Sequence, residues 1–120
     1  MRSRIMLLLA AALFTAGAGW AELQAAGSGN STNDRLLAMP EAQRAQFLGA
    51  RVHGDCVGLE AFPMGVLKSG PAKGAAYWSV RCKNGNSYAI EFPPPSVKVR
   101  PMYVDCQKLQ GTGKECFKKF

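Results

Sequence analysis

The chain has 120 residues, a length that allows one small domain, and its 15 Lys and Arg against 8 Asp and Glu give a net charge of +7. Its four cysteines and one histidine form no Cys-x-x-Cys pair and no histidine cluster, which argues against zinc, haem attachment and dithiol redox chemistry. The sequence also has no glycine-rich phosphate-binding loop. We therefore expect neither a metal nor a cofactor.

Residues 1–21 have the three parts of an export signal. Arg2 and Arg4 give a positive start, residues 5–14 are an unbroken apolar run, and small residues lead to Ala18 and Ala21. The run is about half of the roughly 20 residues that cross a bilayer. We predict cleavage after Ala21, or after Ala18, and no transmembrane anchor in the processed chain. Cleavage after Ala21 leaves 99 residues, with 13 Lys and Arg against 8 Asp and Glu, in the periplasm or outside the cell.

Residues 22–33 are predicted to be a flexible leader, because they are mainly Ala, Gly, Ser and Asn and hold one large aliphatic residue, Leu23. Residues 34–120 then form the single domain. A short turn over 34–39 is followed by a helix from Pro40 to about Leu48, since proline suits the first helical position and Glu41 complements the helix dipole. One apolar face of this helix is expected to carry Ala42, Ala45, Leu48 and Val52.

The pattern changes to alternation at Cys56, where Val57, Leu59 and Ala61 predict one apolar face of a first strand. Pro63 lacks the amide that a central strand needs, so it ends this strand or marks it as an edge. A loop is expected over residues 64–74.

The clearest predicted element is a hairpin of residues 77–82 and 86–92. A three-residue loop, Lys83-Asn84-Gly85, pairs Trp78 with Ile90 and Val80 with Tyr88, which keeps one face apolar. Three prolines at 93–95 then interrupt the sheet. A last strand is expected to include Val97, Val99 and residues 102–104, followed by a short helix that Asp105 caps and that ends at Leu109. These elements predict an α+β fold: one N-terminal helix packed on a three- or four-stranded antiparallel sheet.

Four cysteines in a short exported chain predict two disulfides. If successive strands are antiparallel neighbours, Cys56, Cys82 and Cys106 lie at one end of the sheet. That arrangement favours the pairs Cys56–Cys82 and Cys106–Cys116, and the pairs Cys56–Cys116 and Cys82–Cys106 remain an alternative. Each disulfide would stabilise the domain by roughly 3 kcal/mol.

Positive charge gathers in residues 81–120, which hold eight Lys and Arg against three acids. The electric field of this positive charge would attract an anionic component of the cell envelope as the binding partner. A protein partner is the alternative. Nucleic acid is not expected, because no recognition module is present and the chain is exported. The candidate anion-binding residues are Arg81, Lys83, Lys98, Arg100, Lys118 and Lys119.

The function expected from these features is that of a small exported, non-enzymatic binding protein or an envelope-associated accessory protein. No catalytic residue is assigned, since the acids are scattered and nothing marks a nucleophile for His53, the only histidine. Two alternatives are a small secreted enzyme that uses His53 and an inhibitor of a secreted enzyme.

Three segments carry a resemblance to small exported proteobacterial proteins of uncharacterised function: Tyr77-Trp78-Ser79-Val80-Arg81-Cys82, Ser87-Tyr88-Ala89-Ile90 and Glu115-Cys116-Phe117-Lys118-Lys119-Phe120. The resemblance covers about residues 36–120 and implies a periplasmic or secreted setting, with no activity to carry over. A weaker one, in Arg81-Cys82-Lys83-Asn84-Gly85, is to the cysteine hairpin of small periplasmic lysozyme inhibitors. The rest of their pattern is missing, and a basic lysozyme would repel this basic chain.

Overall fold

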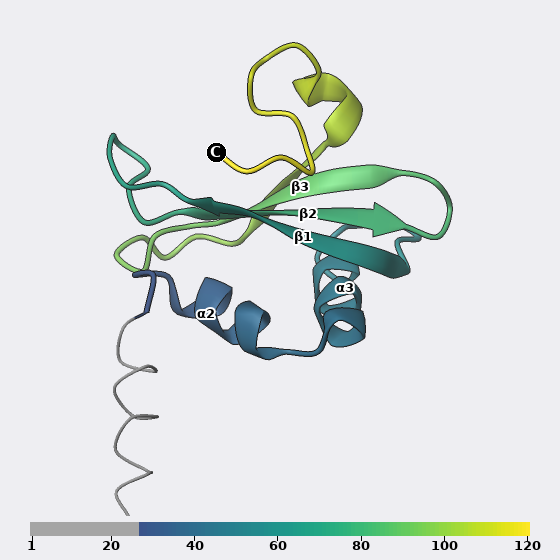
Figure 1. The fold of residues 1–120 in the computed structure, drawn as a ribbon, viewed down its shortest axis with the longest axis horizontal. Helices are drawn as coiled ribbons and strands as arrows, with labels where there is room; N and C mark the ends of the chain where they lie inside the picture. Colours follow the sequence, from purple (N-terminus) through teal and green to yellow (C-terminus); the bar gives the residue numbers. More distant parts are fainter. Residues whose placement is uncertain (1–26) are drawn as a thin grey trace, which may run out of the picture.

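The structure, a computed structural model, describes residues 27–120, and the predicted export signal and residues 22–26 of the predicted leader lie outside the described residues. Four strands form one antiparallel sheet in chain order: β1 (Gly58–Val66), β2 (Ala76–Cys82), β3 (Ser87–Phe92) and β4 (Met102–Asp105). Helices α2 (Ser31–Ala38) and α3 (Glu41–Gly49) cover one face of the sheet, and the C-terminal residues cover the other (Figure 1). The predicted α+β class is confirmed.

Helix α3 lies where the sequence predicts a helix, with Pro40 as its N-cap residue. Helix α2 is an addition, because a short turn was expected over residues 34–39. It begins at Ser31, inside the predicted leader, since the Asn30 side chain accepts a hydrogen bond from the Asn33 amide at 3.1 Å and caps the helix. Residues before the expected domain boundary at Asp34 thus belong to helix α2. Neither helix that the structure describes is long and apolar enough to cross a membrane.

The hydrophobic core lies between the helices and the sheet face that we call the helix face. Buried residues of α2 and α3 meet alternate residues of β2 and β3, and Tyr88 packs partly buried against them. Ala42 is exposed, so the apolar stripe of α3 is narrower than predicted. The largest fully buried apolar side chains of this core are Leu36, Leu48, Trp78, Val80 and Ile90.

The predicted hairpin register is confirmed, with Trp78 paired to Ile90 and Val80 to Tyr88. Gly85 has a φ of 93°, which the turn requires and which favours glycine. Strand β1 is an edge strand, as Pro63 allows, but it continues to Val66.

Two apolar alternations in the sequence do not become buried faces. An irregularity in the pairing of β1 lies between Gly58 and Glu60, and Val57 and Leu59 are both exposed. In the last strand, Pro101 cannot donate to a ladder, so β4 begins only at Met102 and leaves Val97 and Val99 exposed in the preceding loop.

The two disulfides are Cys56–Cys82 and Cys106–Cys116, the favoured pairing, and no cysteine is free within residues 27–120. Two disulfides in a domain of this size indicate a protein that folds in an oxidising compartment outside the cytosol. The Cys56–Cys82 disulfide joins Cys56, just before β1, to Cys82, the last residue of β2. The second closes a loop in the C-terminal residues, where Asp105 caps the short 3-10 helix η1 (Cys106–Leu109) as predicted.

Candidate functional site: a cavity under the C-terminal segment

The sheet face opposite the helices, which we call the outer face, is hollow at its centre. Side chains alternate along a strand, so Tyr77 and Ser79 of β2 and Ala89 and Glu91 of β3 point away from the helix core. Ser79 and Ala89 are directly paired across the two strands. Because Ala89 is small, it leaves a depression between the larger side chains that surround it.

Residues 106–120, which we call the C-terminal segment, run back across this outer face (Figure 1). Two hydrogen bonds fix the last part of the segment to the sheet. The Phe117 amide donates to the Ser79 hydroxyl at 2.9 Å, and the Phe120 amide donates to the Met64 carbonyl at 3.1 Å. The Phe117 ring packs near Phe62, with 6.2 Å between ring centroids. The segment therefore covers the depression without filling it.

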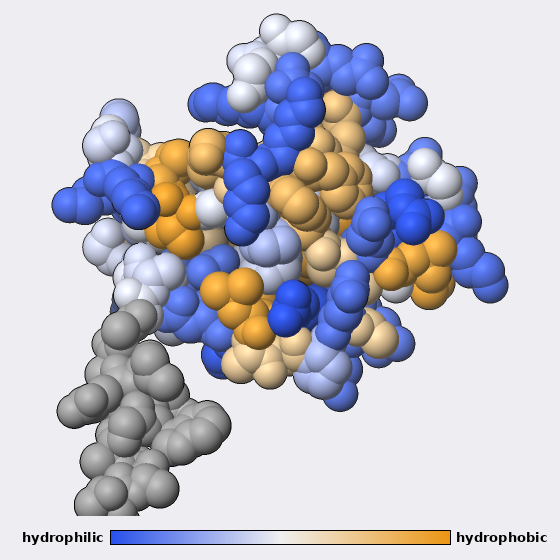
Figure 2. Space-filling view, in the orientation of Figure 1, coloured by the Kyte–Doolittle hydropathy of each residue, from blue (hydrophilic) through white to orange (hydrophobic). Residues whose placement is uncertain are grey.

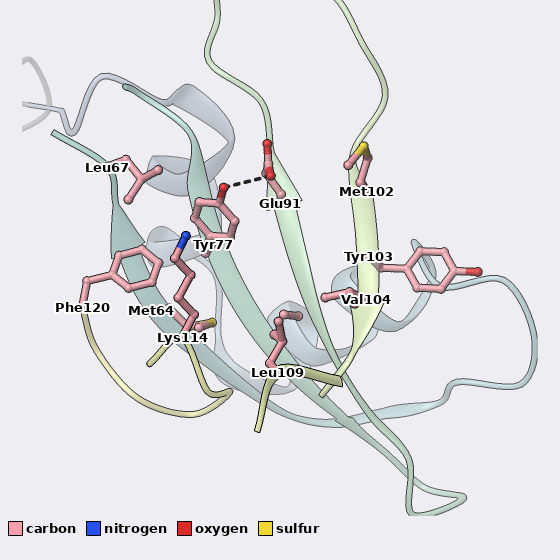
Figure 3. A pocket seen from close by; sticks show the side chains of 11 residues that line it. Met64, Leu67, Tyr77, Glu91, Met102, Tyr103, Val104, Leu109, Lys114 and Phe120 are labelled. Carbon is pink, nitrogen blue, oxygen red and sulfur yellow. Dashed lines mark hydrogen bonds between the residues drawn. The ribbon is translucent and has the colours of Figure 1, made fainter. Parts of the chain in front are cut away.

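The result is a cavity of about 190 Å³ between the outer face and the C-terminal segment (Figure 3). Every strand contributes to its lining, and Leu109 and Phe120 come from the segment above. Met102 and Phe120 at its rim are 62% and 56% exposed, so the cavity is reachable from solvent. Apolar residues also gather at the surface around the base of the segment, whereas its tip and the surrounding loops are hydrophilic (Figure 2).

Three polar side chains stand at this otherwise apolar site: Tyr77, Glu91 and Lys114. The Tyr77 hydroxyl donates to Glu91 Oε1 at 2.8 Å, and the Lys114 side chain extends from the segment toward Tyr77 (Figure 3). Burial of Tyr77, reinforced by the hydrogen bond to Glu91 and by the charge of Glu91, raises the pKa of Tyr77 to about 12. The phenol thus stays protonated at neutral pH. The arrangement suits an apolar ligand with a polar end.

The predicted anion-binding residues fall at different places. The β1–β2 and β3–β4 loops lie at one end of the sheet, which we call the loop end, and the β2–β3 hairpin lies at the other (Figure 1). Lys98 and Arg100 belong to the β3–β4 loop at the loop end, and Arg81 and Lys83 lie at the hairpin end. Arg81 Nε is 3.6 Å from Glu60 Oε1, the one ion pair within residues 27–120. Lys118 and Lys119 belong to the C-terminal segment, and Lys119 Nζ lies 6.0 Å from the centroid of the Phe62 ring.

Three lysines near the cavity were absent from the predicted set. Lys114 lines the cavity itself, and Lys68 and Lys73, in the β1–β2 loop, line a groove that adjoins it together with Lys119. Sequence reasoning missed Lys68 and Lys73 because they lie before the basic C-terminal third. The small outward-facing side chain of Ala89 was the one sequence signal for a hollow outer face.

His53 and Asp55 lie in an exposed turn after α3, away from the cavity. The His53 ring packs at 5.9 Å, between centroids, from Tyr103, whose ring points away from the cavity (Figure 3). No group of three or more His, Cys, Asp and Glu side chains that could hold a metal ion occurs among residues 27–120.

Comparisons with protein-family models, with curated proteins and with solved structures find no match for this chain. The site is therefore interpreted from its own geometry.

Proposed function

We propose that the protein is a small exported, non-enzymatic binding protein of the periplasm or the secreted fraction, and that it takes up an envelope ligand in the cavity. The observation that carries this proposal is the apolar space of about 190 Å³ under the C-terminal segment. An apolar cavity of about 150 Å³ can hold a benzene-sized molecule. Transfer of an apolar group from water into this space supplies the driving force for binding.

The proposed export draws on the signal-like residues 1–21 and on the two disulfides. It is tested by the intact mass of the protein recovered from the envelope and from the medium, alkylated with and without prior reduction. The expected chain begins at Glu22, or at Gly19, and has no thiol to alkylate before reduction. An uncleaved chain with four free thiols would contradict the proposed location.

Binding is tested with N-phenyl-1-naphthylamine, a neutral probe whose fluorescence rises in apolar surroundings. The wild-type protein should enhance its fluorescence saturably, and Ala89→Leu should remove the enhancement, because the leucine side chain would project into the cavity that Ala89 lines. The matched control is Ala50→Leu, at an exposed position at the end of α3, behind the sheet. Equal enhancement by the wild type and by Ala89→Leu would place the probe elsewhere and refute the proposed site.

A further inference from the structure

The cavity lies across the sheet, and we call it the slot. Its lining includes Met64 of β1, Tyr77 of β2, Ala89 of β3 and Val104 of β4. Neighbouring strands lie about 4.8 Å apart, so the four strands span on the order of 14 Å. A cavity of about 190 Å³ that all four strands line can take an extended aliphatic chain lying across them.

The side chains around the slot are themselves adaptable. Met64 and Met102 lie on opposite sides of it, and methionine side chains adjust to irregular apolar partners because they are unbranched and flexible. Leu67 and Leu109 complete the aliphatic surface. These four side chains offer no strong hydrogen-bonding group, so the apolar chain of the ligand would be recognised here by shape alone.

Positive charge surrounds the loop-end side of the slot. Leu67 lines both the cavity and the groove, so the two spaces adjoin at that residue. The side chains that line them include four lysines and one carboxylate, that of Glu91, which already accepts the Tyr77 hydroxyl. None of the four lysines, Lys68, Lys73, Lys114 and Lys119, has a carboxylate of the described chain within ion-pair distance.

We propose that the slot binds one aliphatic chain of an anionic amphiphile and that the lysines of the groove hold its head group, a carboxylate or a phosphate. This inference rests on the proposed function and adds the chemical class of the ligand. The apolar chain gains from burial, and the head group remains partly hydrated among exposed lysine side chains, where it is attracted without the full penalty of desolvation. The net positive charge of the protein adds long-range attraction for an anion.

The test is displacement of bound N-phenyl-1-naphthylamine by four amphiphiles with the same twelve-carbon chain, each kept below its micelle concentration or, for the neutral alcohol, below its solubility limit. Laurate and monododecyl phosphate carry the two candidate anionic head groups, dodecanol is neutral, and dodecylamine is cationic. At low ionic strength we expect an anion to displace the probe at about tenfold lower concentration than dodecanol, with dodecylamine weakest, and this advantage should shrink as salt is added. The stronger of the two anions identifies the head group.

A pair of charge-matched variants shows where the selectivity originates. Lys68→Gln/Lys73→Gln should remove most of the advantage of the anions over dodecanol and leave dodecanol itself unchanged. The control, Lys83→Gln/Lys108→Gln, removes the same charge from exposed positions outside the cavity and the groove and should preserve the advantage.

The outcomes separate this inference from the proposed function. If the probe binds in the cavity but the four amphiphiles displace it equally, or both lysine pairs behave alike, the anionic head group is refuted and the binding function stands. If the probe does not bind, or Ala89→Leu binds it as the wild type does, the proposed function fails first.

Discussion

Replacing Asn33 with alanine should lower the free energy of unfolding by about 2 kcal/mol, because it removes the partner of a buried donor. The Trp78 indole is fully buried, and its Nε1 donates to Asn33 Oδ1 at 2.8 Å. Without this oxygen the indole N–H would be buried and unpaired, which costs about 1–3 kcal/mol. For a urea dependence of about 1.5 kcal/mol per molar, the denaturation midpoint would fall by about 1.3 M.

A double-mutant cycle with Trp78→Phe isolates this hydrogen bond, since phenylalanine has no N–H to satisfy. Unfolding in urea would be followed by far-UV circular dichroism, because the Trp78 variant loses its tryptophan signal. Asn33→Ala should be less destabilising by about 1–2 kcal/mol in the Trp78→Phe background than in the wild type. Ser28→Ala, which removes the other side-chain partner of Asn33, is the control and should change stability by less than about 0.5 kcal/mol. A coupling energy near zero would refute the assigned role of this hydrogen bond.

Three further predictions follow from the same contacts. Replacing both cysteines of one disulfide with alanine should lower the free energy of unfolding by about 3.5 kcal/mol for Cys56–Cys82, whose sequence separation is 26, and by about 2.7 kcal/mol for Cys106–Cys116, whose separation is 10. Only the loss of Cys106–Cys116 should also weaken probe binding in the cavity, since that disulfide holds the C-terminal segment. The side-chain amide of Asn30 donates to the Gly74, Phe92 and Pro93 carbonyls. Asn30→Asp keeps a good helix cap but replaces this donor with a carboxylate that faces the carbonyl oxygens, so the thermal unfolding midpoint of Asn30→Asp should lie below that of Asn30→Ser. The pKa of Tyr77 in the folded protein, about 12, exceeds the ordinary value of 10.0, so the stability that the protonated phenol contributes is complete below pH 10 and is lost as pH rises toward 12. An ultraviolet titration should show that Glu91→Gln lowers this pKa only part of the way, since burial, the larger cause, remains.

Local chemistry explains which parts of the fold could be predicted. Helix α3 and the hairpin have their signals within a few residues, in Pro40-Glu41 and in Asn84-Gly85, and neither needs distant contacts to be recognised. The disulfide pairing followed from the meander order, because successive antiparallel strands bring Cys56 and Cys82 to one end.

The elements that the sequence did not predict depend on contacts between distant residues. Helix α2 begins in a polar stretch, and its start is held by Asn30, whose side-chain amide donates to carbonyls more than 40 residues away. The cavity likewise needs residues 106–120 to cross the sheet, and the Phe117 amide finds Ser79 at a separation of 38 residues. No periodicity in the chain specifies either arrangement. The lysines of the groove come together for the same reason, from a loop and from the C-terminal segment.

The hollow outer face raises the question of why Ala89 is not a larger residue. Leucine at this position would bury about three more carbon atoms against the cavity lining, a gross gain of about 2 kcal/mol before any strain. We therefore expect Ala89→Leu to raise the urea midpoint even as it blocks probe binding. The matched substitution Ala61→Leu, at a buried position in the helix core, should lower it, by about 1–3 kcal/mol, because that side of the sheet is already filled. If Ala89→Leu gains stability and loses binding together, the small side chain sacrifices stability for the open cavity, as functional sites often do. If it loses stability as Ala61→Leu does, the segment packs too closely on the sheet to admit a ligand, and the binding site must be sought elsewhere on the surface.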